Sequence, residues 1–134
     1  MTESFQVSTR SRSEFIDITG RVMNVLSSSN IRDGICQVFV PHTTAGITIN
    51  ENADPSVVAD LLAALERMAP DDALYHHSEG NSPAHVKASL VGFCQTVPVE
   101  DGKLVLGTWQ GIYLCEFDGP RTRHVVVKVQ PDAE

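Results

Sequence analysis

The sequence predicts an α+β domain of about seven strands and two or three helices, an arrangement that two packed sheets would accommodate. Three observations lead to this prediction. Apolar and polar residues alternate near the N-terminus, a long amphipathic helix pattern covers residues 55–68, and the C-terminal third consists of strand patterns separated by turns. The chain has 134 residues, of which 42% are hydrophobic and 20% charged, so we expect one globular domain over residues 1–134.

The N-terminal part predicts two strands, a helix and a third strand. Apolar and polar residues alternate over 5–9, and a shorter strand is expected over 15–18. Apolar residues then recur at helical spacing over 22–29, and Asn30 and the turn residues after it end this helix. The mostly apolar run 34–40 predicts a strand at the centre of a sheet.

A second helix is predicted after a polar break at 41–46 and a short strand at 47–49. Asp54 is a suitable N-cap, and Pro55 suits the first helical position. The helix is expected to end near Met68, because a single apolar stripe runs that far along it. The residues of this stripe are Val58, Leu61, Leu62, Leu65 and Met68.

A third, short helix is predicted from Pro83 to about Gly92. Ser82 is expected to cap it, and Val86 and Leu90 are expected to form its packing face. The remaining chain contains four strand patterns, at 93–99, 103–106, 109–117 and 124–129. Asp-Gly at 101–102 is typical of a hairpin turn between the first two strands, and Asp-Gly-Pro at 118–120 is expected to turn the chain between the last two.

Composition excludes several classes of function. The net charge is −7 and no concentrated run of Lys and Arg is present, so we expect no nucleic-acid surface. No apolar stretch approaches the roughly 18 residues that a membrane span requires, and residues 1–10 lack the apolar centre of a signal peptide. We therefore expect a cytoplasmic protein that binds neither nucleic acid nor membrane.

The three cysteines, Cys36, Cys94 and Cys115, are odd in number and share no CxxC spacing. Each lies in an apolar, strand-like segment. We therefore expect small buried thiols and no metal-binding or nucleophilic role. This cysteine usage favours a reducing compartment.

The densest group of chemically versatile residues is the run 75–85, which holds three of the five histidines. The run has the residues of a loop that enters a helix, and His85 falls in the first helical turn. The positive end of the helix dipole disfavours a protonated imidazole, so His85 would be suited to metal ligation or general-base chemistry. The alternative is a structural contact at the helix cap. His76 and His77 are adjacent, so we expect at most one of them to face a site.

Other polar residues lie at the ends of predicted strands. His42 follows a buried-looking strand and precedes two threonines, and its alternative is a strand-end histidine hydrogen-bonded to the backbone. Trp109 and Gln110 lie between two glycines, as though the backbone passes close to another group; the alternative is a β-bulge beside a core tryptophan. The cations available for phosphate are Lys87, Arg121 and Arg123, for which solvated surface charge is the default interpretation.

Four blocks of the sequence resemble the signature blocks of the YjbQ-like family, which is commonly labelled "secondary thiamine-phosphate synthase enzyme". They are Pro-His-Thr-Thr-Ala-Gly at 41–46, Asn-Glu-Asn-Ala-Asp-Pro at 50–55, Glu-Gly-Asn-Ser-Pro-Ala-His-Val-Lys-Ala-Ser at 79–89, and Leu-Gly-Thr-Trp-Gln-Gly-Ile-Tyr at 106–113. The blocks occur in the family's order and span nearly the whole chain, so together they are highly specific.

The resemblance implies a mixed, largely antiparallel β-sandwich-like α+β domain that assembles as a homotrimer. It implies a polar pocket around His42, one of His76 and His77, and His85, where a divalent metal (zinc or magnesium) or a phosphate-like anion would bind. The family label implies weak thiamine-phosphate synthase activity, in which a pyrimidine diphosphate is joined to a thiazole phosphate and pyrophosphate is released.

Our leading hypothesis is a homotrimeric transferase that acts at a low rate on small phosphorylated thiamine precursors in a histidine-lined pocket. We assign catalytic roles to His85, Glu51 and Gln110, with Glu79 as an alternative carboxylate to Glu51. The predicted metal ligands are His42, His76, His77 and His85. The residues predicted to bind the substrate or its phosphate are Thr43, Thr44, Asn52, Asn81, Ser82, Lys87, Ser89 and Trp109.

Two other functions would use the same histidines. One is a metal-dependent hydrolase of a phosphorylated metabolite, in which water is the acceptor. The other is a non-enzymatic metal- or ligand-binding protein, which the lack of a recognisable nucleophile favours. The sequence contains no Gly-rich phosphate loop of the GxGxxG or GxxxxGK[ST] type.

Overall fold

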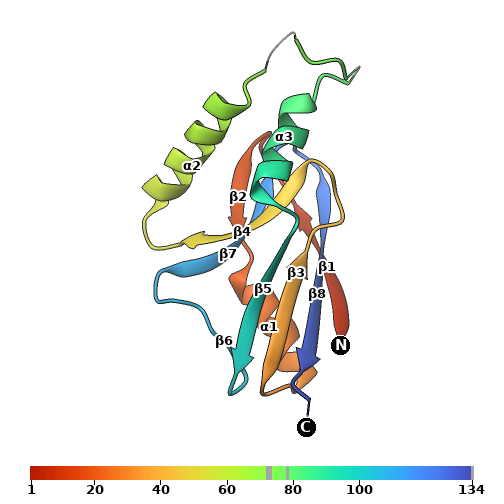
Figure 1. Ribbon diagram of the computed structural model, residues 1–134, viewed down its shortest axis with the longest axis vertical. Helices are drawn as coiled ribbons and strands as arrows, with labels where there is room; N and C mark the ends of the chain where they lie inside the picture. The colour runs from red at the N-terminus through yellow and green to blue at the C-terminus, as the bar shows by residue number, and fades with distance from the viewer. Residues whose placement is uncertain (72–73, 78, 134) are drawn as a thin grey trace.

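The protein is described by a computed structural model that covers residues 1–71, 74–77 and 79–133. These residues form three helices and eight strands, and the strands make one five-stranded and one three-stranded sheet (Figure 1). Every strand pairing in the described part of the chain is antiparallel. The prediction of a largely antiparallel α+β domain is confirmed.

The five-stranded sheet has the strand order β1-β8-β3-β5-β6. Its strands are β1 (Thr2–Ser8), β8 (Thr122–Pro131), β3 (Gly34–Phe39), β5 (Cys94–Glu100) and β6 (Lys103–Leu104). The first and last strands of the chain therefore lie side by side, and both termini lie near the same edge of the molecule (Figure 1).

β3 occupies the centre of this sheet, as predicted for residues 34–40, but only one of its faces is buried. Cys36 and Val38 are fully buried, whereas Ile35 and Phe39 on the opposite face are 40% and 41% exposed. Apolar residues occur on both faces of β3, so its sequence lacks the alternation of apolar and polar residues that a half-exposed strand normally shows.

The three-stranded sheet has the order β2-β7-β4, from β2 (Glu14–Asp17), β7 (Gln110–Glu116) and β4 (Ala45–Glu51). Its middle strand, β7, is buried on both faces. Ile112 and Leu114 join the main core between the two sheets, and Tyr113 and Cys115 join a second apolar cluster on the other side. This sheet is therefore the middle layer of the molecule.

Helix α1 (Thr19–Ser29) packs into the main core through Val22, Val25 and Leu26, and Asn30 ends it in a left-handed conformation with φ 58°. Helix α2 (Pro55–Met68) has the predicted bounds, and its N-cap is Asp54, whose Oδ1 accepts the Ser56 N–H at 2.9 Å. Both helices confirm their predictions. The stripe of α2 is only half-buried, however, and α2 stands to one side of the sheets (Figure 1).

Helix α3 (Ser82–Val91) lies over the outer side of the three-stranded sheet (Figure 1). Two details of its prediction were wrong. The N-cap is Asn81 and makes no side-chain capping bond, so Ser82 is the first helical residue. The packing face consists of Pro83, Ala84, Lys87 and Ala88, whereas Val86 is half-buried and Leu90 is 54% exposed. Small side chains face the sheet because the helix lies close to it.

Of the two predicted turns in the C-terminal third, one lies within a sheet and the other lies between the two sheets. Asp101 and Gly102 both have positive φ, 54° and 75°, and join β5 to β6 in the predicted hairpin. The Asp-Gly-Pro segment at 118–120 joins β7 to β8, which belong to different sheets. This segment therefore turns the chain between the last two strands, as predicted, and carries it from one sheet to the other.

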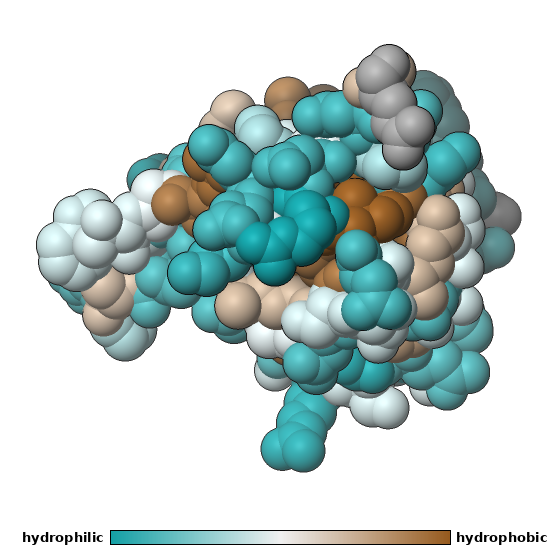
Figure 2. Space-filling view, turned by 90° about the horizontal axis from the view of Figure 1, so that it is seen from below, coloured by the Kyte–Doolittle hydropathy of each residue, from teal (hydrophilic) through white to brown (hydrophobic). Residues whose placement is uncertain are grey.

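The cysteine prediction holds for Cys36 and Cys115, which are buried, and fails for Cys94, which is exposed on the outer face of β5. Among the described residues, no helix is long and apolar enough to cross a membrane. Hydrophilic residues dominate the end of the molecule that Figure 2 shows from below, with hydrophobic residues visible only in patches between them.

Candidate anion and small-molecule site

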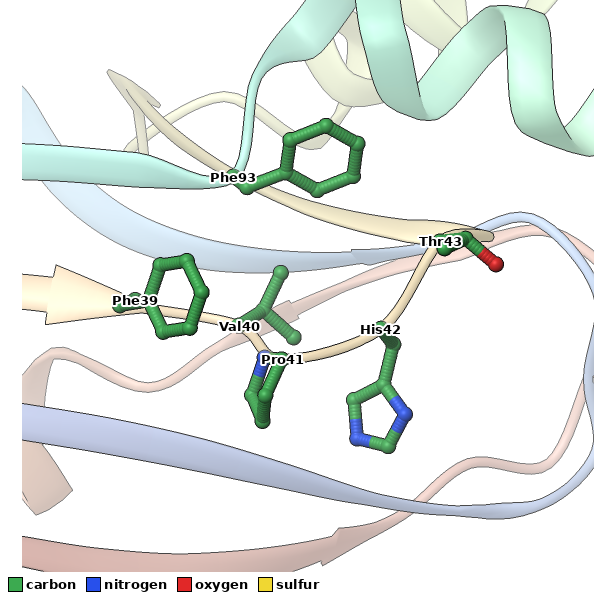
Figure 3. Close-up of a pocket in the computed structure, with 6 residues that line it drawn as sticks. All are labelled: Phe39, Val40, Pro41, His42, Thr43 and Phe93. Atoms are coloured by element: carbon green, nitrogen blue, oxygen red, sulfur yellow. The ribbon is translucent and has the colours of Figure 1, made fainter.

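A cavity of about 300 Å³ lies where β3 ends and β5 begins. Most of its lining is apolar, and the exceptions are His42 and Thr43 (Figure 3). The rings of Phe39 and Phe93 lie on the two sides of its apolar part. The complete lining is Phe39, Val40, Pro41, His42, Thr43 and Phe93. An apolar pocket with a few polar groups at one side is the usual form of a small-molecule site.

Local backbone contacts hold the loop between β3 and β4 at this cavity. Val40 separates β3 from Pro41, which has no N–H to continue the strand. The Val40 N–H donates to the Phe93 carbonyl at 2.9 Å, and the Ile47 N–H donates to the Gly92 carbonyl at 3.0 Å. These bonds attach both ends of the loop to the junction between α3 and β5, so His42 and Thr43 have a fixed position.

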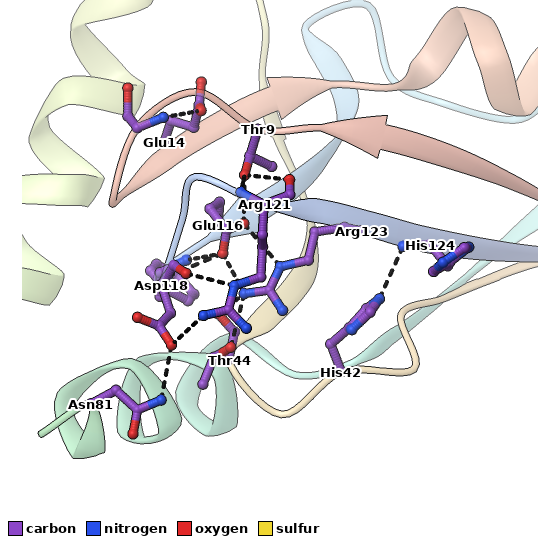
Figure 4. Close-up of polar contacts among 12 residues, drawn as sticks. Thr9, Glu14, His42, Thr44, Asn81, Glu116, Asp118, Arg121, Arg123 and His124 are labelled. Atoms are coloured by element: carbon purple, nitrogen blue, oxygen red, sulfur yellow. Dashed lines mark hydrogen bonds and ion pairs between the residues drawn. The ribbon is translucent and has the colours of Figure 1, made fainter. Parts of the chain in front are cut away.

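His42 is bonded to the backbone of β8. Its Nε2 accepts the His124 N–H at 2.9 Å, and the two imidazole rings stack with their centroids 6.0 Å apart (Figure 4). This contact is the strand-end hydrogen bond expected as the alternative to a functional role. It also means that a neutral His42 carries its proton on Nδ1, which remains a free donor atom in the described structure.

The surroundings of His42 favour its neutral form. Partial burial is the main cause that lowers its pKa, and the positive charge of Arg123 is the next. His124 and Arg121 lower the pKa further, and only Glu116 acts in the opposite direction. His42 therefore lies close to the guanidinium groups of Arg123 and Arg121, each of which is paired with a carboxylate.

Glu116 is a fully buried carboxylate at the end of β7. Its two oxygens accept five hydrogen bonds, from the Thr9 hydroxyl at 2.8 Å, the Phe117 and Asp118 N–H groups at 3.0 Å, and Nε and Nη2 of Arg123. Nε of Arg123 lies 2.9 Å from Oε1. A carboxylate that accepts this many hydrogen bonds has no lone pair left for acid–base chemistry.

Arg123 is only 2% exposed, and its guanidinium lies between Glu116 and the loop before β4 (Figure 4). Besides its two bonds to Glu116, Nη2 donates to the hydroxyl and the carbonyl of Thr44 at 2.8 and 3.2 Å. The expectation of a solvated surface charge was wrong for Arg123. It fails for Lys87 too, which is 6% exposed and paired with Glu66 of α2, whereas Arg121 is exposed as expected.

A second polar group links the start of α3 to the segment between β7 and β8. Asn81 Nδ2 donates to Asp118 Oδ2 at 2.8 Å, and Arg121 Nη2 donates to the same oxygen at 3.0 Å. Asn81 Oδ1 is buried and has no hydrogen-bond partner in the described part of the chain. This oxygen is an acceptor, so it suits a donor group of a ligand better than a phosphate oxygen.

The histidine run places His77, and not His76, beside His85. The His77 and His85 rings meet edge to face with centroids 5.5 Å apart, and His77 Nε2 lies 3.9 Å from Glu79 Oε2. His76 is exposed. His77 is exposed too, so the expectation that at most one of the pair faces a site stays a prediction.

The comparison with known proteins covers nearly the whole chain. The family described as "UPF0047 protein YjbQ-like" matches residues 3–132. The chain belongs to the YjbQ-like family. A UPF0047 protein of Methanocaldococcus jannaschii is 52% identical over 132 residues, which cover 98% of this chain and 96% of the relative. UPF0047 protein YugU of Bacillus subtilis is 52% identical over 130 residues, which cover 96% and 98%.

Solved structures of YjbQ-like proteins have the same fold. A crystal structure from Clostridium acetobutylicum matches with a TM-score of 0.94 and 53% identity, covering 96% of this chain and 99% of that one. A protein from Sulfolobus solfataricus, described as YbjQ-like and of unknown function, matches with a TM-score of 0.94 and 36% identity, covering 98% and 97%. These matches show the family and the fold and specify no reaction.

Within one chain, β4 separates two groups of residues from the YjbQ-like signature blocks, one at each end of the strand. His42–Thr44 precede β4, whereas Glu51 and Asn52 lie at its other end, roughly 20 Å away for a strand of this length. Trp109 and Gln110 belong to the second group, since the Asn52 N–H donates to the Trp109 carbonyl at 2.9 Å. The second group therefore lies apart from the cavity within the single chain.

The second group explains the glycines around Trp109. A Cβ on Gly111 would lie 2.7 Å from Nδ2 of Asn52, and Gln110 Oε1 accepts the Gly107 N–H at 2.8 Å. The backbone at Gly111 thus passes close to the Asn52 side chain, and the Gln110 side chain is hydrogen-bonded to the backbone three residues earlier. Trp109 is 63% exposed, so the alternative of a core tryptophan was wrong.

Several other predicted binding residues of this YjbQ-like chain are engaged in structural bonds. Thr44 is buried and accepts from Arg123, and the Ser89 hydroxyl donates to the His85 carbonyl at 2.8 Å. Among the described residues, no group of three or more His, Cys, Asp or Glu side chains is arranged to hold a metal ion.

Arg123 was expected only as a solvated cation available for phosphate, and Glu116, Asp118 and His124 were not among the predicted site residues. The sequence did contain a sign that Arg123 is buried. Arg123 lies two residues before Val125 in the alternating pattern of β8, and Val125, Val127 and Val129 all face the core. A charged residue on the buried face of a strand predicts a buried partner. That partner, Glu116, lies on the strand before it.

Proposed function

We propose that this YjbQ-like protein is a low-activity transferase of the thiamine-phosphate synthase type. It would join a pyrimidine diphosphate to a thiazole phosphate and release pyrophosphate. One observation carries the proposal: a cavity of about 300 Å³, lined by Phe39 and Phe93, opens beside His42 and Thr43, close to the guanidinium group of Arg123. This combination suits a flat aromatic ring that carries a phosphate group.

The chemistry requires stabilisation of the charge that develops on the departing diphosphate. His42 supplies an Nδ1–H donor that is held in place by the bond from the His124 N–H to Nε2. Thr43 supplies an exposed hydroxyl at the same cavity. Phe39 and Phe93 would hold the ring, so that the diphosphate lies toward these polar groups.

A low rate agrees with the charge of the chain. It carries 17 acidic residues against 10 Lys and Arg, and the buried ammonium of Lys87 is paired with Glu66. Few cations therefore remain for two phosphorylated substrates.

We propose that any divalent ion is magnesium carried by the diphosphate. Mg²⁺ commonly keeps several waters and takes only one or two protein ligands in addition to substrate phosphates, so it does not require a site built from three side chains. The pair of His77 and Glu79 near His85 is available to it, whereas His42 has no free lone pair, because Nε2 accepts the His124 N–H and Nδ1 carries the proton. The ion would neutralise phosphate charge.

We also propose that the chain assembles as a homotrimer through the outer face of the five-stranded sheet. Phe39 pairs with Val126 and Cys94 across this face, and Ile35 pairs with Pro98. Ile35 and Phe39 are both at least 40% exposed, and an apolar face of this kind is typical of an interface between subunits.

The transferase proposal is tested by incubating the purified chain with a pyrimidine diphosphate, a thiazole phosphate and Mg²⁺, and detecting thiamine phosphate by mass spectrometry. We expect product from the wild type and a decrease of about 100-fold or more in His42→Ala. Asp60→Ala is the control, since Asp60 is exposed on α2 and has no predicted role in the site. It should retain the wild-type rate.

Other outcomes contradict the proposal in different ways. Formation of the pyrimidine alcohol without thiazole phosphate would indicate a hydrolase. Absence of turnover, together with failure of the highly expressed, folded protein to complement a thiamine-requiring strain, would refute transferase activity.

A further inference from the structure

The guanidinium of Arg123 is fixed from two sides but not fully engaged. Nε and Nη2 donate to Glu116, and Nη2 also donates to Thr44. Glu116 is itself held by the Thr9 hydroxyl and by two backbone N–H groups. The plane of the guanidinium is therefore determined by partners that lie on β7 and on the loop before β4.

The remaining terminal nitrogen, Nη1, still has two N–H donors. None of the residues that the structure describes accepts a hydrogen bond from Nη1, and Figure 4 draws no contact from it. Nη1 is not among the buried side-chain atoms that lack a partner. It is therefore accessible to solvent, although the whole residue is only 2% exposed. A purely structural ion pair does not require such an opening.

Figure 4 shows the imidazole of His42, a second donor, beside the guanidinium of Arg123, with Nε2 turned toward the His124 N–H. His42 feels the charge of Arg123 strongly enough for it to be the second cause that lowers the His42 pKa. Because Nε2 of His42 accepts from the backbone, its free donor is Nδ1–H. Arg121 and His124 add positive charge to the same region of a chain whose net charge is −7.

We propose that Arg123 and His42 form an anion subsite, in which Nη1 of Arg123 and Nδ1–H of His42 bind a phosphoryl group of the ligand. Glu116 is the positioning residue that orients the guanidinium for this contact. The identity of the ligand as a phosphorylated ring compound rests on the proposed function. The subsite itself rests only on the donors described above.

The chemistry favours a phosphate monoester or a diphosphate. A guanidinium nitrogen with two N–H donors and a neutral imidazole N–H together supply three donors to the oxygens of one phosphoryl group. The buried attachment of Arg123 to Glu116 reduces the entropy lost when the anion binds, because the guanidinium is already in position. The pocket lined by Phe39 and Phe93 lies next to His42 and would hold the rest of the ligand.

The test measures binding of inorganic phosphate and of pyrophosphate to the full chain by NMR and calorimetry. In the wild type, we expect the side-chain N–H signals of Arg123 and the imidazole signals of His42 to shift together as either anion is added. This measurement needs no variant. Absence of these shifts at saturating anion would overturn the proposal.

Variants then separate binding from folding. Arg123→Lys keeps the charge, and the double variant Arg123→Met with Glu116→Gln removes both buried charges, an exchange that proteins often tolerate. Both should bind pyrophosphate at least 10-fold more weakly than the wild type while retaining its circular dichroism spectrum. Arg32→Lys is the matched control, because Arg32 is an exposed arginine paired with Asp101, and it should bind as the wild type does.

Wild-type affinity in either folded Arg123 variant would show that Arg123 is only structural and would overturn the subsite. The result is independent of turnover. If the anion binds through Arg123 and His42 but no thiamine phosphate is formed, the subsite stands and the transferase proposal fails. If turnover is observed but the Arg123 variants bind the anion normally, the transferase proposal stands and the subsite fails.

Discussion

The most constrained side chains of the molecule belong to one buried charge pair. Glu116 and Arg123 are 0% and 2% exposed, and each charge is compensated by the other and by neighbouring donors or acceptors. Burial of two charges costs so much desolvation that such a pair adds little net stability. Its value here is geometric: it fixes the position of the Arg123 guanidinium, and Thr44 extends this order to the loop that carries His42.

The three cysteines should differ sharply in reactivity. Burial raises the pKa of Cys36 to about 11 and raises the pKa of Cys115 as well, so both remain protonated at neutral pH. Cys94 is exposed on β5. Cys94 shares the outer sheet face with Phe39, which the proposed trimer would bury. We therefore expect a disulfide reagent such as DTNB to modify one thiol rapidly in the folded, dissociated variant Ile35→Lys, and all three thiols after denaturation. Adding Cys94→Ser should abolish the rapid reaction, and rapid modification of this double variant would contradict the assignment.

At the residue scale, the sequence indicated candidate side chains but did not indicate which residues they contact. Local alternation indicated that at most one of His76 and His77 faces a site and did not indicate which; in the structure His77 contacts His85. The role of Arg123 was not predicted, because its partners Glu116 and Thr44 lie on other strands. Such partners are determined by the packing of the two sheets, which no local pattern encodes.

Helix α2 shows what local signals can determine at the scale of an element. Its start follows from Asp54 and Pro55 and its end from the last apolar residue, so both bounds were predicted correctly. The face of α3 was not, because small residues contact the sheet and larger apolar residues remain outside. A periodic pattern of large apolar residues is therefore informative only where a helix packs through them.

The cap of α2 predicts a pH dependence. Hydrogen bonds from the Ser56 N–H and hydroxyl lower the pKa of Asp54 below its ordinary value of 3.8. The folded state therefore favours the carboxylate. The stabilisation is fully present above the unfolded pKa and is lost as the pH falls through the folded pKa.

The test compares urea unfolding of the wild type and Asp54→Ala at about pH 7 and at about pH 3. We expect the variant to be less stable at the higher pH and the difference to shrink at the lower one. Asp60→Ala, at an exposed position of the same helix, is the control and should show little difference at either pH. A difference for Asp54→Ala that persists unchanged at low pH would contradict the cap assignment.

A second prediction at this scale concerns the attachment of α2 to α3. The ammonium of Lys87 is buried against the sheet side of α3 and is paired with Glu66, which is 58% exposed. Because Glu66→Ala leaves a buried ammonium without its partner, we expect a loss of about 1–2 kcal/mol in the free energy of unfolding in urea.

The same Asp60→Ala variant is the control for this loss and should differ from the wild type by less than about 0.5 kcal/mol. Lys87→Met should recover part of the stability of Glu66→Ala when the two are combined, because it removes the unpaired charge. Equal stability of Glu66→Ala and Asp60→Ala would show that Lys87 finds another partner or water.

At the scale of the whole molecule, the three layers distribute apolar surface unevenly. The three-stranded sheet is covered on both sides, by the five-stranded sheet with α1 and by α2 with α3. The five-stranded sheet has its core face buried, and its other face retains exposed Ile35 and Phe39. The sequence predicted a two-sheet domain, but which strands belong to which sheet depends on connections between distant segments, such as the pairing of β1 with β8.

This uneven distribution predicts the consequence of a charge on the outer sheet face. In the proposed homotrimer, Ile35 would be buried between subunits, so Ile35→Lys would place an ammonium in an apolar interface and dissociate the assembly. Sedimentation equilibrium at micromolar concentration should give about three times the chain mass of 14.6 kDa for the wild type and a value near one chain for Ile35→Lys. Met23→Lys is the matched control, because Met23 is 48% exposed on α1, and it should leave the mass unchanged. A monomeric wild type would refute the trimer, whereas a trimeric Ile35→Lys would place the interface on a different surface, with the half-buried stripe of α2 as the next to examine.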